Sequence, residues 1–337
     1  MWQHIRMEIV LADISALRQI REARCSGKMI SPLPLPPSDE MATGARQLDR
    51  LKAGDLATRE SPARILVPSG TSHTRSQRVV QSEWSLPTDE NAVAQPDMVF
   101  RVRPNVVALT PPACALSLAR SWPVEWLALL LDELCGCYSL TPDGNAFIET
   151  TPACNLDSIR KFARKMCGQH GIKRLSTAIK LAGNGAASPF ESQVHAWLCQ
   201  NVRRGGFGIP QPLLNATIYI GSGYGGGTAG TQCRPDLYWP DARFGVECDG
   251  AQHNDPLQSE QDALRSVRLS NVGIHEARIS VKAFHSLNAA CDFGMSVRTE
   301  LGLLNPVNTS GNPHQSHFEL WKSLVQSPWD RVHLRRP

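Results

Sequence analysis

Three carboxylates lie close together in the stretch between Cys233 and His253. Asp236 precedes a short apolar segment, and after a tight turn Glu247 and Asp249 alternate with apolar residues. Because successive side chains of a strand point to opposite faces, we expect Glu247 and Asp249 on one face of the second strand of a hairpin. Crowded carboxylates repel each other, and a hard cation such as Mg²⁺ or Mn²⁺ compensates that repulsion through oxygen ligands. The spacing therefore predicts a metal site held by Asp236 and Glu247, with Asp249 beside it.

A metal ion at such a site polarises a phosphodiester and activates a water molecule to attack it. The residues by themselves leave a second interpretation open, because acidic side chains also protect an exposed strand edge from pairing with other strands. The first interpretation makes the hairpin a catalytic site, whereas the second makes it a solvated surface.

The order Pro-Asp, a turn and then Glu-x-Asp-Gly-x-x-His resembles the PD-(D/E)XK nuclease fold, and within it the very-short-patch-repair-like endonuclease domains called DUF559. The resemblance runs from about Ser188 to Phe284. It implies an α/β fold with a restriction-endonuclease-like core and Mg²⁺-dependent cleavage of DNA. The family's Asp and Glu correspond to Asp236 and Glu247, and its acidic residue on the preceding helix corresponds to Glu191.

The superfamily generally has a lysine two residues after the glutamate, and Asp249 stands there in this chain, as in the DUF559 variant. The resemblance implies that His253 or Gln252 orients or polarises water in place of that lysine. It also implies that Asp249 and Glu191 assist the two metal ligands. The catalytic set expected from the sequence thus includes a histidine and four carboxylates.

Glu191 has a second interpretation that needs no metal. Ser188 is a favourable N-cap, Pro189 occupies the first helical position, and Glu191 completes a Ser-x-x-Glu capping box. In such a box the glutamate accepts a backbone N–H at the start of the helix. One carboxylate is not expected to serve both this cap and a metal ion.

Residues 155–182 are predicted to form a basic helical arm with seven basic residues and one acid. Its apolar positions follow helical spacing and are Ile159, Phe162, Ala163 and Met166. Its basic positions on the other side include Arg160, Lys161, Arg164 and Lys165. Such a face can contact the phosphate backbone of DNA. The alternative is a helix face that is only solvated.

The composition is that of a globular protein, with 42% hydrophobic and 20% charged residues in a chain of 337. The net charge of +4 permits a nucleic-acid partner without requiring one. The ten cysteines include no Cys-x-x-Cys pair, so a structural zinc site is unsupported. No apolar run reaches transmembrane length and no convincing signal peptide is present. We therefore expect a cytoplasmic protein with no membrane partner.

Four regions are predicted along the chain: a winged-helix-like region with a Pro-rich loop over 1–70, a mixed middle domain over 71–182, an endonuclease-like domain over 183–298, and a loose tail over 299–337. The first region is expected to contain helices over 8–24 and 45–53 followed by a strand. Its segment RQLDRLKAGDLATRESPARILVPSG resembles the winged domain of AbiEi-type antitoxin regulators. A helical subdomain that only packs is the alternative.

Three hypotheses about function follow from these patterns. The leading one is a metal-dependent DNA endonuclease that hydrolyses phosphodiester bonds. The second is a DNA-binding transcriptional regulator of the antitoxin type, in which the nuclease fold is not catalytic. The third is a structural or interaction protein of a defence locus.

Overall fold

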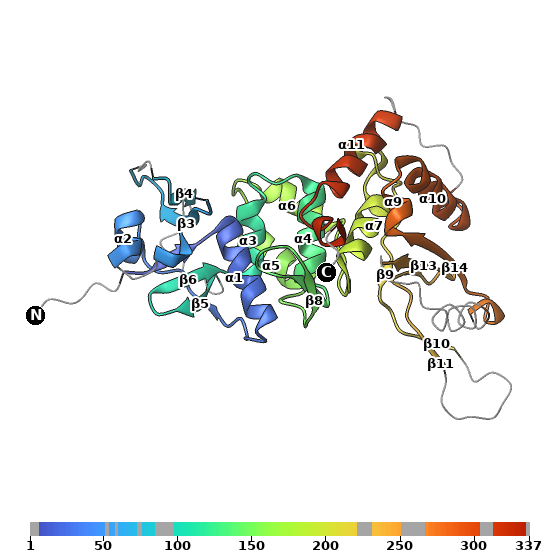
Figure 1. The fold of residues 1–337 in the computed structure, drawn as a ribbon, viewed down its shortest axis with the longest axis horizontal. Coiled ribbons are helices and arrows are strands. Elements are labelled where there is room, and N and C mark those ends of the chain that lie inside the picture. The colour runs from blue at the N-terminus through green and yellow to red at the C-terminus, as the bar shows by residue number, and fades with distance from the viewer. Residues whose placement is uncertain are drawn as a thin grey trace, which may run out of the picture. The chain divides into compact units, whose positions relative to one another are not determined.

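The computed structural model of the protein describes residues 7–50, 54–57, 60–72, 76–84, 98–220, 231–250, 267, 269–303 and 313–334. The chain divides into two compact units (Figure 1). The first unit comprises Met1–Leu127, Thr141–Asp143 and Ala153–Ile179, and the second comprises Ala128–Leu140, Gly144–Pro152 and Lys180–Pro337. Both units combine helices with mixed sheets, which confirms the expected α/β class. Within the described residues, no helix has the length and apolar character needed to cross a membrane.

A mixed sheet, six-stranded in the described part of the chain, forms the centre of the first unit in the order β2-β5-β6-β1-β3-β4. Its strands are β1 (Ile9–Leu11), β2 (Pro32–Leu33), β3 (Ala63–Pro68), β4 (Val79–Trp84), β5 (Val99–Arg103) and β6 (Val106–Leu109). The two middle strands, β1 and β6, are apolar and buried along their whole length. Continuous apolar runs of this kind are typical of strands that are covered on both faces.

The helix predicted over residues 8–24 starts later than expected. Ile9–Leu11 form the middle strand β1, and helix α1 runs over Asp13–Cys25. A short run of Ile, Val and Leu suits a buried strand as well as a helix. Pairing with β6 on one side and β3 on the other decides the outcome here. Helix α1 then packs against β3 and β6.

The domain boundary predicted at residue 70 falls inside this sheet. Strands β3 and β4 pair in parallel, from Ala63 opposite Val79 to Pro68 opposite Trp84. Region 1–70 and strands β4, β5 and β6 of region 71–182 therefore share one sheet, whereas Ala128–Leu140 and Gly144–Pro152 belong to the second unit. The structure does not confirm a separate winged-helix unit. The short helix expected over 45–53 is present as α2 (Ala45–Arg50), and residues 51–53 lie outside the described residues.

Helices α3 (Pro111–Leu118), α5 (Leu156–Lys165) and α6 (Ile172–Ile179) pack together in the first unit. The arm predicted over 155–182 is thus two helices instead of one. Gly168 and Gly171 lie between these helices in the left-handed region, with φ of 86° and 91°. A Cβ atom at Gly171 would also come within 3.0 Å of the Ala119 backbone. Glycine therefore permits the close approach of this turn to the end of α3.

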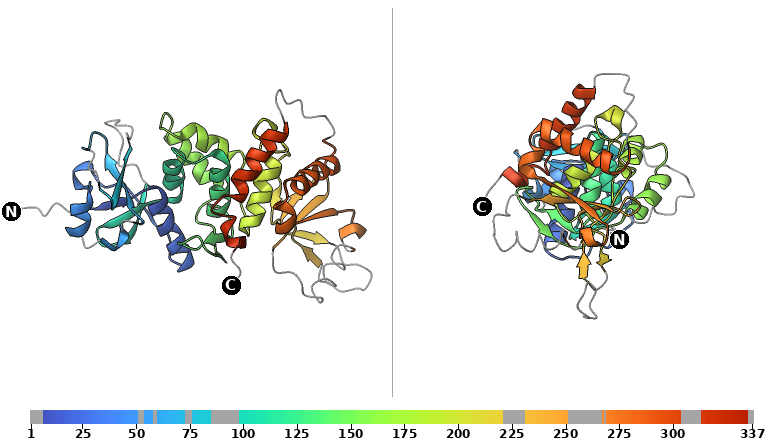
Figure 2. Two further views of the ribbon diagram at one scale, coloured as in Figure 1. Left: turned by 45° about the horizontal axis from the view of Figure 1, so that its top comes forward. Right: turned by 90° about the vertical axis from the view of Figure 1, so that its right-hand side faces the viewer.

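A sheet in the order β14-β13-β12-β9, four-stranded in the described part of the chain, lies in the second unit. Its strands are β9 (Leu213–Leu214), β12 (Leu237–Trp239), β13 (Phe244–Asp249) and β14 (His275–Ser280). Strand β12 pairs antiparallel with β9 and with β13, and β14 pairs parallel with β13. Helix α7 (Pro189–Cys199) contacts β13 (Figures 1 and 2). Strands β10 (Ile218–Ile220) and β11 (Thr231–Cys233) pair antiparallel, and the glycine-rich segment 221–230 between them lies outside the described residues.

Aromatic rings form the centre of the second unit's core. Trp197 of α7 is fully buried, and its ring lies edge-on to Phe207 and Phe284. Its indole N–H donates to the Ala290 carbonyl oxygen at 2.9 Å. The remaining elements of this unit are the end of α4 (Val124–Leu134), β7 (Tyr138–Leu140), β8 (Phe147–Glu149), α9 (Val281–Phe284), α10 (Leu287–Glu300), α11 (Pro313–Val325) and α12 (Arg331–Leu334).

The prediction of a loose tail over 299–337 is wrong for residues 313–334. Helix α11 packs against α7 and α10, and Leu324 and Trp329 are fully buried. The Trp329 indole donates to Glu133 Oε2 at 2.8 Å, and the Gln193 amide donates to the Leu324 carbonyl oxygen at 3.1 Å. The Asn- and Pro-rich composition before α11 indicated a loop, and burial against α7 is what orders the residues after it.

Candidate functional site

The predicted hairpin is present. Strands β12 and β13 pair antiparallel with Leu237 opposite Val246, and the turn is closed by a hydrogen bond from Arg243 N–H to the Pro240 carbonyl oxygen at 3.1 Å. Val246 is fully buried, whereas Glu247 is only half-buried. Burial does not alternate along β13 as the sequence suggests: Phe244–Val246 are buried, and Glu247–Asp249 are half-buried.

Asp236 lies beside Glu247 at the start of β12. Its Oδ2 accepts a hydrogen bond from the Cys248 N–H at 2.7 Å. Continuing the register of Leu237 and Val246 by one residue places Asp236 directly opposite Glu247, and opposed residues share a sheet face. Asp236 directly precedes β12, so this extended register puts it next to Glu247 of β13 across the hairpin.

Glu191 is hydrogen-bonded at the start of helix α7, where the capping box is predicted, but its carboxylate binds the N–H one residue before the N-cap Ser188. Ser188 Oγ accepts from Glu191 N–H at 3.1 Å, and Glu191 Oε2 accepts from Ala187 N–H at 2.8 Å. The same Oε2 also accepts from the Asn215 side-chain amide at 2.6 Å. Burial raises the pKa of the Glu191 carboxyl, and these hydrogen bonds and the charge of Arg234 only partly oppose that rise.

Asn215 ties the start of α7 to the start of β12. Its backbone is in the left-handed region with φ of 52°, which asparagine tolerates better than most residues. Its side chain donates to Glu191, its N–H donates to the Asp236 carbonyl oxygen at 2.9 Å, and its carbonyl oxygen accepts from Arg234 Nε at 2.9 Å. Glu191 and Asp236 are therefore connected through one residue.

The pKa of the Cys248 thiol reflects the negative charge around it. Burial raises the pKa of Cys248 well above its ordinary value, and nearby negative charge raises it further. The charges responsible belong to Asp236, Glu191, Glu247 and Asp249. These four carboxylates of the predicted set thus all contribute negative charge at one thiol, with Glu191 on the helix and the others in the hairpin.

Strand β14 adds two charged residues that the sequence interpretation missed. Arg278 is in register with Glu247, and Glu276 is in register with Gly245. Arg278 Nη1 lies 3.9 Å from Asp249 Oδ1, and Arg278 Nη2 lies 3.7 Å from Glu276 Oε2. Glu276 and Arg278 are two residues apart in a predicted strand, so the alternation rule placed both on one face. Only the parallel pairing shows that this is the face of Glu247.

The metal site stays a prediction that depends on the chemistry of its donors and not on their number. Among the described residues, no group of three or more His, Cys, Asp or Glu side chains is placed to hold a metal ion. Gln252 and His253, predicted to act on water, lie outside the described residues. Mg²⁺ is commonly bound through only one or two protein carboxylates, with water and substrate phosphate completing its shell. The neighbouring carboxylates Asp236 and Glu247 fit that pattern.

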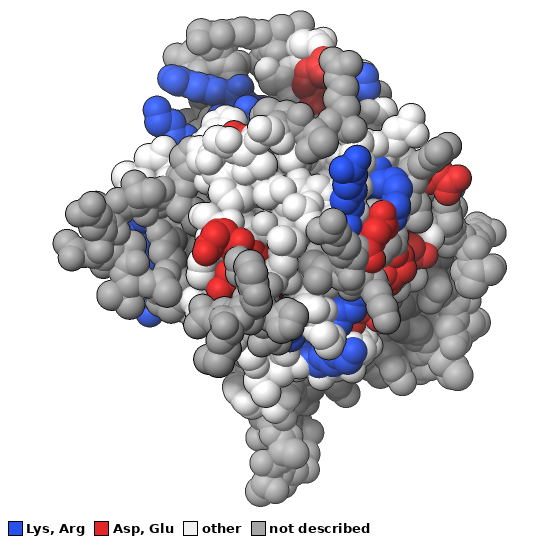
Figure 3. Space-filling view, turned by 90° about the vertical axis from the view of Figure 1, so that its left-hand side faces the viewer, with Lys and Arg blue, Asp and Glu red and all other residues white. Residues whose placement is uncertain are grey.

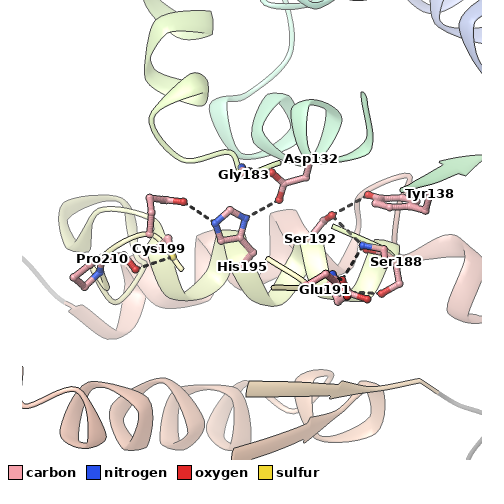
Figure 4. A network of polar contacts seen from close by, with 12 residues as sticks. Asp132, Tyr138, Gly183, Ser188, Glu191, Ser192, His195, Cys199 and Pro210 are labelled. Carbon is pink, nitrogen blue, oxygen red and sulfur yellow. Dashed lines mark hydrogen bonds and ion pairs between the residues drawn. The ribbon is translucent and has the colours of Figure 1, made fainter. Parts of the chain in front are cut away.

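A second polar network in this unit is buried and structural (Figure 4). His195 is fully buried, with Nδ1 2.7 Å from Asp132 Oδ2 and Nε2 2.7 Å from Gln211 Oε1. Burial acts to lower the pKa of His195, but Asp132, assisted by Cys199, raises it well above its ordinary value. A protonated ring donates from both nitrogens to these oxygens. Asp132 also accepts from Gly183 N–H at 2.8 Å, so the network fastens α4 to α7.

The basic helix α5 has the predicted faces. Arg160, Lys161, Arg164 and Lys165 are exposed, and the apolar stripe opposite them is buried. Arg160 pairs with Asp157 at 2.8 Å, whereas the other three basic residues have no acidic partner among the described residues. On the right of the face shown in Figure 3, by contrast, basic side chains lie close to acidic ones. Helix α5 thus carries uncompensated positive charge.

Comparisons of the chain with protein-family models, with curated proteins and with solved structures found no match.

Proposed function

We propose that this protein is a metal-dependent DNA endonuclease that hydrolyses phosphodiester bonds at the ends of β12 and β13. The observation that carries the proposal is the hydrogen bond from Cys248 N–H to Asp236, because it sets Asp236 beside Glu247. The order of a helix, an antiparallel hairpin and a parallel strand also agrees with the resemblance to the DUF559 nucleases. An exposed strand edge would not require a carboxylate bonded across the hairpin.

In this proposal Asp236 and Glu247 hold Mg²⁺ or Mn²⁺, and Asp249 adds negative charge beside them. When bound, the cation would polarise the phosphodiester and make a bound water more acidic. Glu191 orients the start of α7 and reaches Asp236 through Asn215, so it acts as a positioning residue in place of a ligand. Proton transfer from water stays assigned to His253 or Gln252 on the resemblance alone.

DNA is the proposed partner, and α5 is the proposed contact with its backbone. Lys161, Arg164 and Lys165 are exposed without an acidic partner among the described residues. Neutralising a phosphate releases condensed counterions, which makes such contacts favourable and sensitive to salt. Arg160 is the weakest candidate of the four predicted residues, because Asp157 already compensates its charge.

A second candidate is a DNA-binding transcriptional regulator of the antitoxin type with a non-catalytic nuclease fold. It is favoured by the engagement of Glu191 in the helix cap, which leaves the described residues without a third ligand for a metal. The basic face of α5 serves this candidate equally well. The two candidates differ in whether DNA is cut.

Cleavage of supercoiled plasmid by the full-length chain distinguishes them. We expect nicking with Mg²⁺ or Mn²⁺, none with EDTA, and none from the Asp236→Asn variant, which keeps the size of the side chain and an oxygen for the Cys248 N–H. Binding of duplex DNA without cleavage of duplex or single strands under either metal would favour the regulator. Cleavage by Asp236→Asn at the wild-type rate would place the activity outside this hairpin.

A further inference from the structure

A cationic side chain lies among the carboxylates on the acidic face of the second unit's sheet. Arg278 on β14 is in register with Glu247 on β13. Residues in register on neighbouring strands project to the same face, as do residues two apart on one strand. Arg278 therefore shares a face with Glu247 and Asp249, and its Nη1 lies 3.9 Å from Asp249 Oδ1. A guanidinium thus stands next to the carboxylates on which the proposed function depends.

The contacts of Arg278 hold it in place and leave it reachable. Its Nη2 lies 3.7 Å from Glu276 Oε2, and the Glu276 side chain is only 5% exposed. The Arg278 side chain is 31% exposed, and that of Asp249 is 36% exposed. The buried Glu276 carboxylate lies on one side of the guanidinium, and part of the Arg278 side chain is accessible to solvent.

We infer that Arg278 contacts the scissile phosphate and stabilises the negative charge that builds on it during hydrolysis. The inference rests on the proposed function. The role requires a positive charge, which Asp249, two residues after Glu247, does not carry. The charge comes from the neighbouring strand instead. The catalytic site then includes an arginine of β14 as well as the carboxylates of the hairpin.

The chemistry requires a cation that keeps its proton. In hydrolysis a water oxygen forms a bond to phosphorus, the bond from phosphorus to one ester oxygen breaks, the water gives up a proton, and the departing oxygen takes one up. Extra negative charge meanwhile accumulates on the nonbridging oxygens. A guanidinium stays protonated and presents N–H donors in a fork that matches phosphate oxygens. Arg278 therefore takes no part in proton transfer and acts through electrostatic stabilisation.

A second cation near the site, Arg234, fits this role less well. Its Nε donates to the Asn215 carbonyl oxygen at 2.9 Å, which fixes the start of β12. Its positive charge acts on Glu191, whose pKa it lowers. Arg278 has its contacts with Asp249 and Glu276, on the face of Glu247.

The test compares Arg278→Met and Arg278→Lys with Lys282→Met in the full-length protein. Lys282 is exposed on α9 and has no ion pair among the described residues, so its variant removes the same charge from the same unit. Two quantities are measured: the single-turnover rate of plasmid cleavage with Mg²⁺, and the affinity for Mn²⁺ alone by titration calorimetry. Thermal melting checks that each variant is folded.

Arg278→Met is expected to slow cleavage by about 100-fold or more, the usual effect of removing one preorganised donor. Arg278→Lys keeps the charge but not the fork, and we expect a loss of roughly 10-fold. Mn²⁺ affinity should be unchanged or higher in Arg278→Met, which removes a cation that repels the metal, and unchanged in Arg278→Lys, which keeps the charge. Lys282→Met should match the wild type in both measurements.

Several results would overturn the inference. Cleavage by Arg278→Met at the wild-type rate, while Asp236→Asn is inactive, would reject the role of Arg278 and keep the proposed function. Parallel loss of cleavage and Mn²⁺ affinity would mean that Arg278 only positions the carboxylates. If Arg278→Met is unfolded, Arg278→Lys decides, and wild-type cleavage by it would count against phosphate contact through the fork. A wild-type protein that cuts nothing rejects both proposals together.

Discussion

Replacing Glu191 separates its role as a cap from a role as a metal ligand. Glu191→Ala removes the acceptor of two hydrogen bonds, from Ala187 N–H at 2.8 Å and from the Asn215 amide at 2.6 Å. The carboxylate is only 6% exposed, so water does not simply replace it. Stranded donors of this kind cost about 1–3 kcal/mol of unfolding free energy. Glu191→Gln keeps an oxygen for both donors, and we expect its stability at neutral pH to lie within about 1 kcal/mol of the wild type.

The raised pKa of Glu191 predicts how this difference changes with pH. A carboxyl whose pKa is higher in the folded state than in the unfolded state binds more protons when folded, between those two values. The unfolding free energy therefore falls as pH rises through that window, which begins near the ordinary value of 4.5. Glutamine does not titrate. The wild type should gain stability relative to Glu191→Gln as pH is lowered from neutral towards that value.

Urea unfolding at a series of pH values, with plasmid cleavage measured in parallel, tests both parts. We expect Glu191→Gln to keep cleavage, because the glutamate acts through the helix start, and Glu191→Ala to shift the urea midpoint down at constant slope. An unchanged midpoint for Glu191→Ala would refute the cap as a source of stability. A difference in unfolding free energy between wild type and Glu191→Gln that does not change with pH would refute the raised pKa of Glu191. Loss of cleavage in a stable Glu191→Gln would show that the carboxylate is a ligand after all.

Three further variants test other parts of the molecule. Asp236→Asn should abolish Mg²⁺-dependent nicking. Its melting temperature should stay close to that of the wild type, because the amide oxygen still accepts the Cys248 N–H. A large drop in melting temperature would show that the charge itself stabilises the hairpin. Lys161→Glu combined with Lys165→Glu should weaken DNA binding. It should also reduce the magnitude of the slope of log affinity against log salt by roughly two, about one for each lost phosphate contact. An unchanged slope in a filter-binding titration would mean that α5 is only a solvated face. Asp132→Asn strands a buried imidazolium and should cost about 3–5 kcal/mol in urea unfolding. The raised pKa of His195 contributes stability that is fully present below the ordinary histidine pKa and is lost as pH rises through the pKa of the folded state. Asp132→Asn should therefore also reduce the fall in stability at alkaline pH. A pH profile of stability identical to that of the wild type would contradict the ion pair.

Local sequence patterns were enough to predict the parts of this protein that short-range physics controls. The two strands and the turn around Pro240 predicted a hairpin, and the structure has it with Leu237 opposite Val246, although burial falls along β13 from Phe244–Val246 to Glu247–Asp249 and does not alternate. The N-cap bond of Ser188 needs only four consecutive residues and is present, whereas the Glu191 carboxylate accepts from Ala187 N–H, one residue before the N-cap. The apolar stripe of α5 likewise follows from the helical repeat alone. In each case the residues that interact are within a few positions of one another or in one hairpin.

Contacts between distant segments were decided only by the tertiary structure. Ile9–Leu11 became a strand because β6 and β3 pair with it on both sides, and the helix pattern of the following residues gave no sign of this. The C-terminal residues around Trp329 are ordered by burial against a unit whose other parts begin at Ala128. Arg278 stands beside Glu247 because β13 and β14 pair in parallel, and parallel neighbours are joined by a long connection that leaves no local signal of register. A sequence specifies which face a side chain takes on its own strand, but packing of the whole chain decides which strand lies next to it.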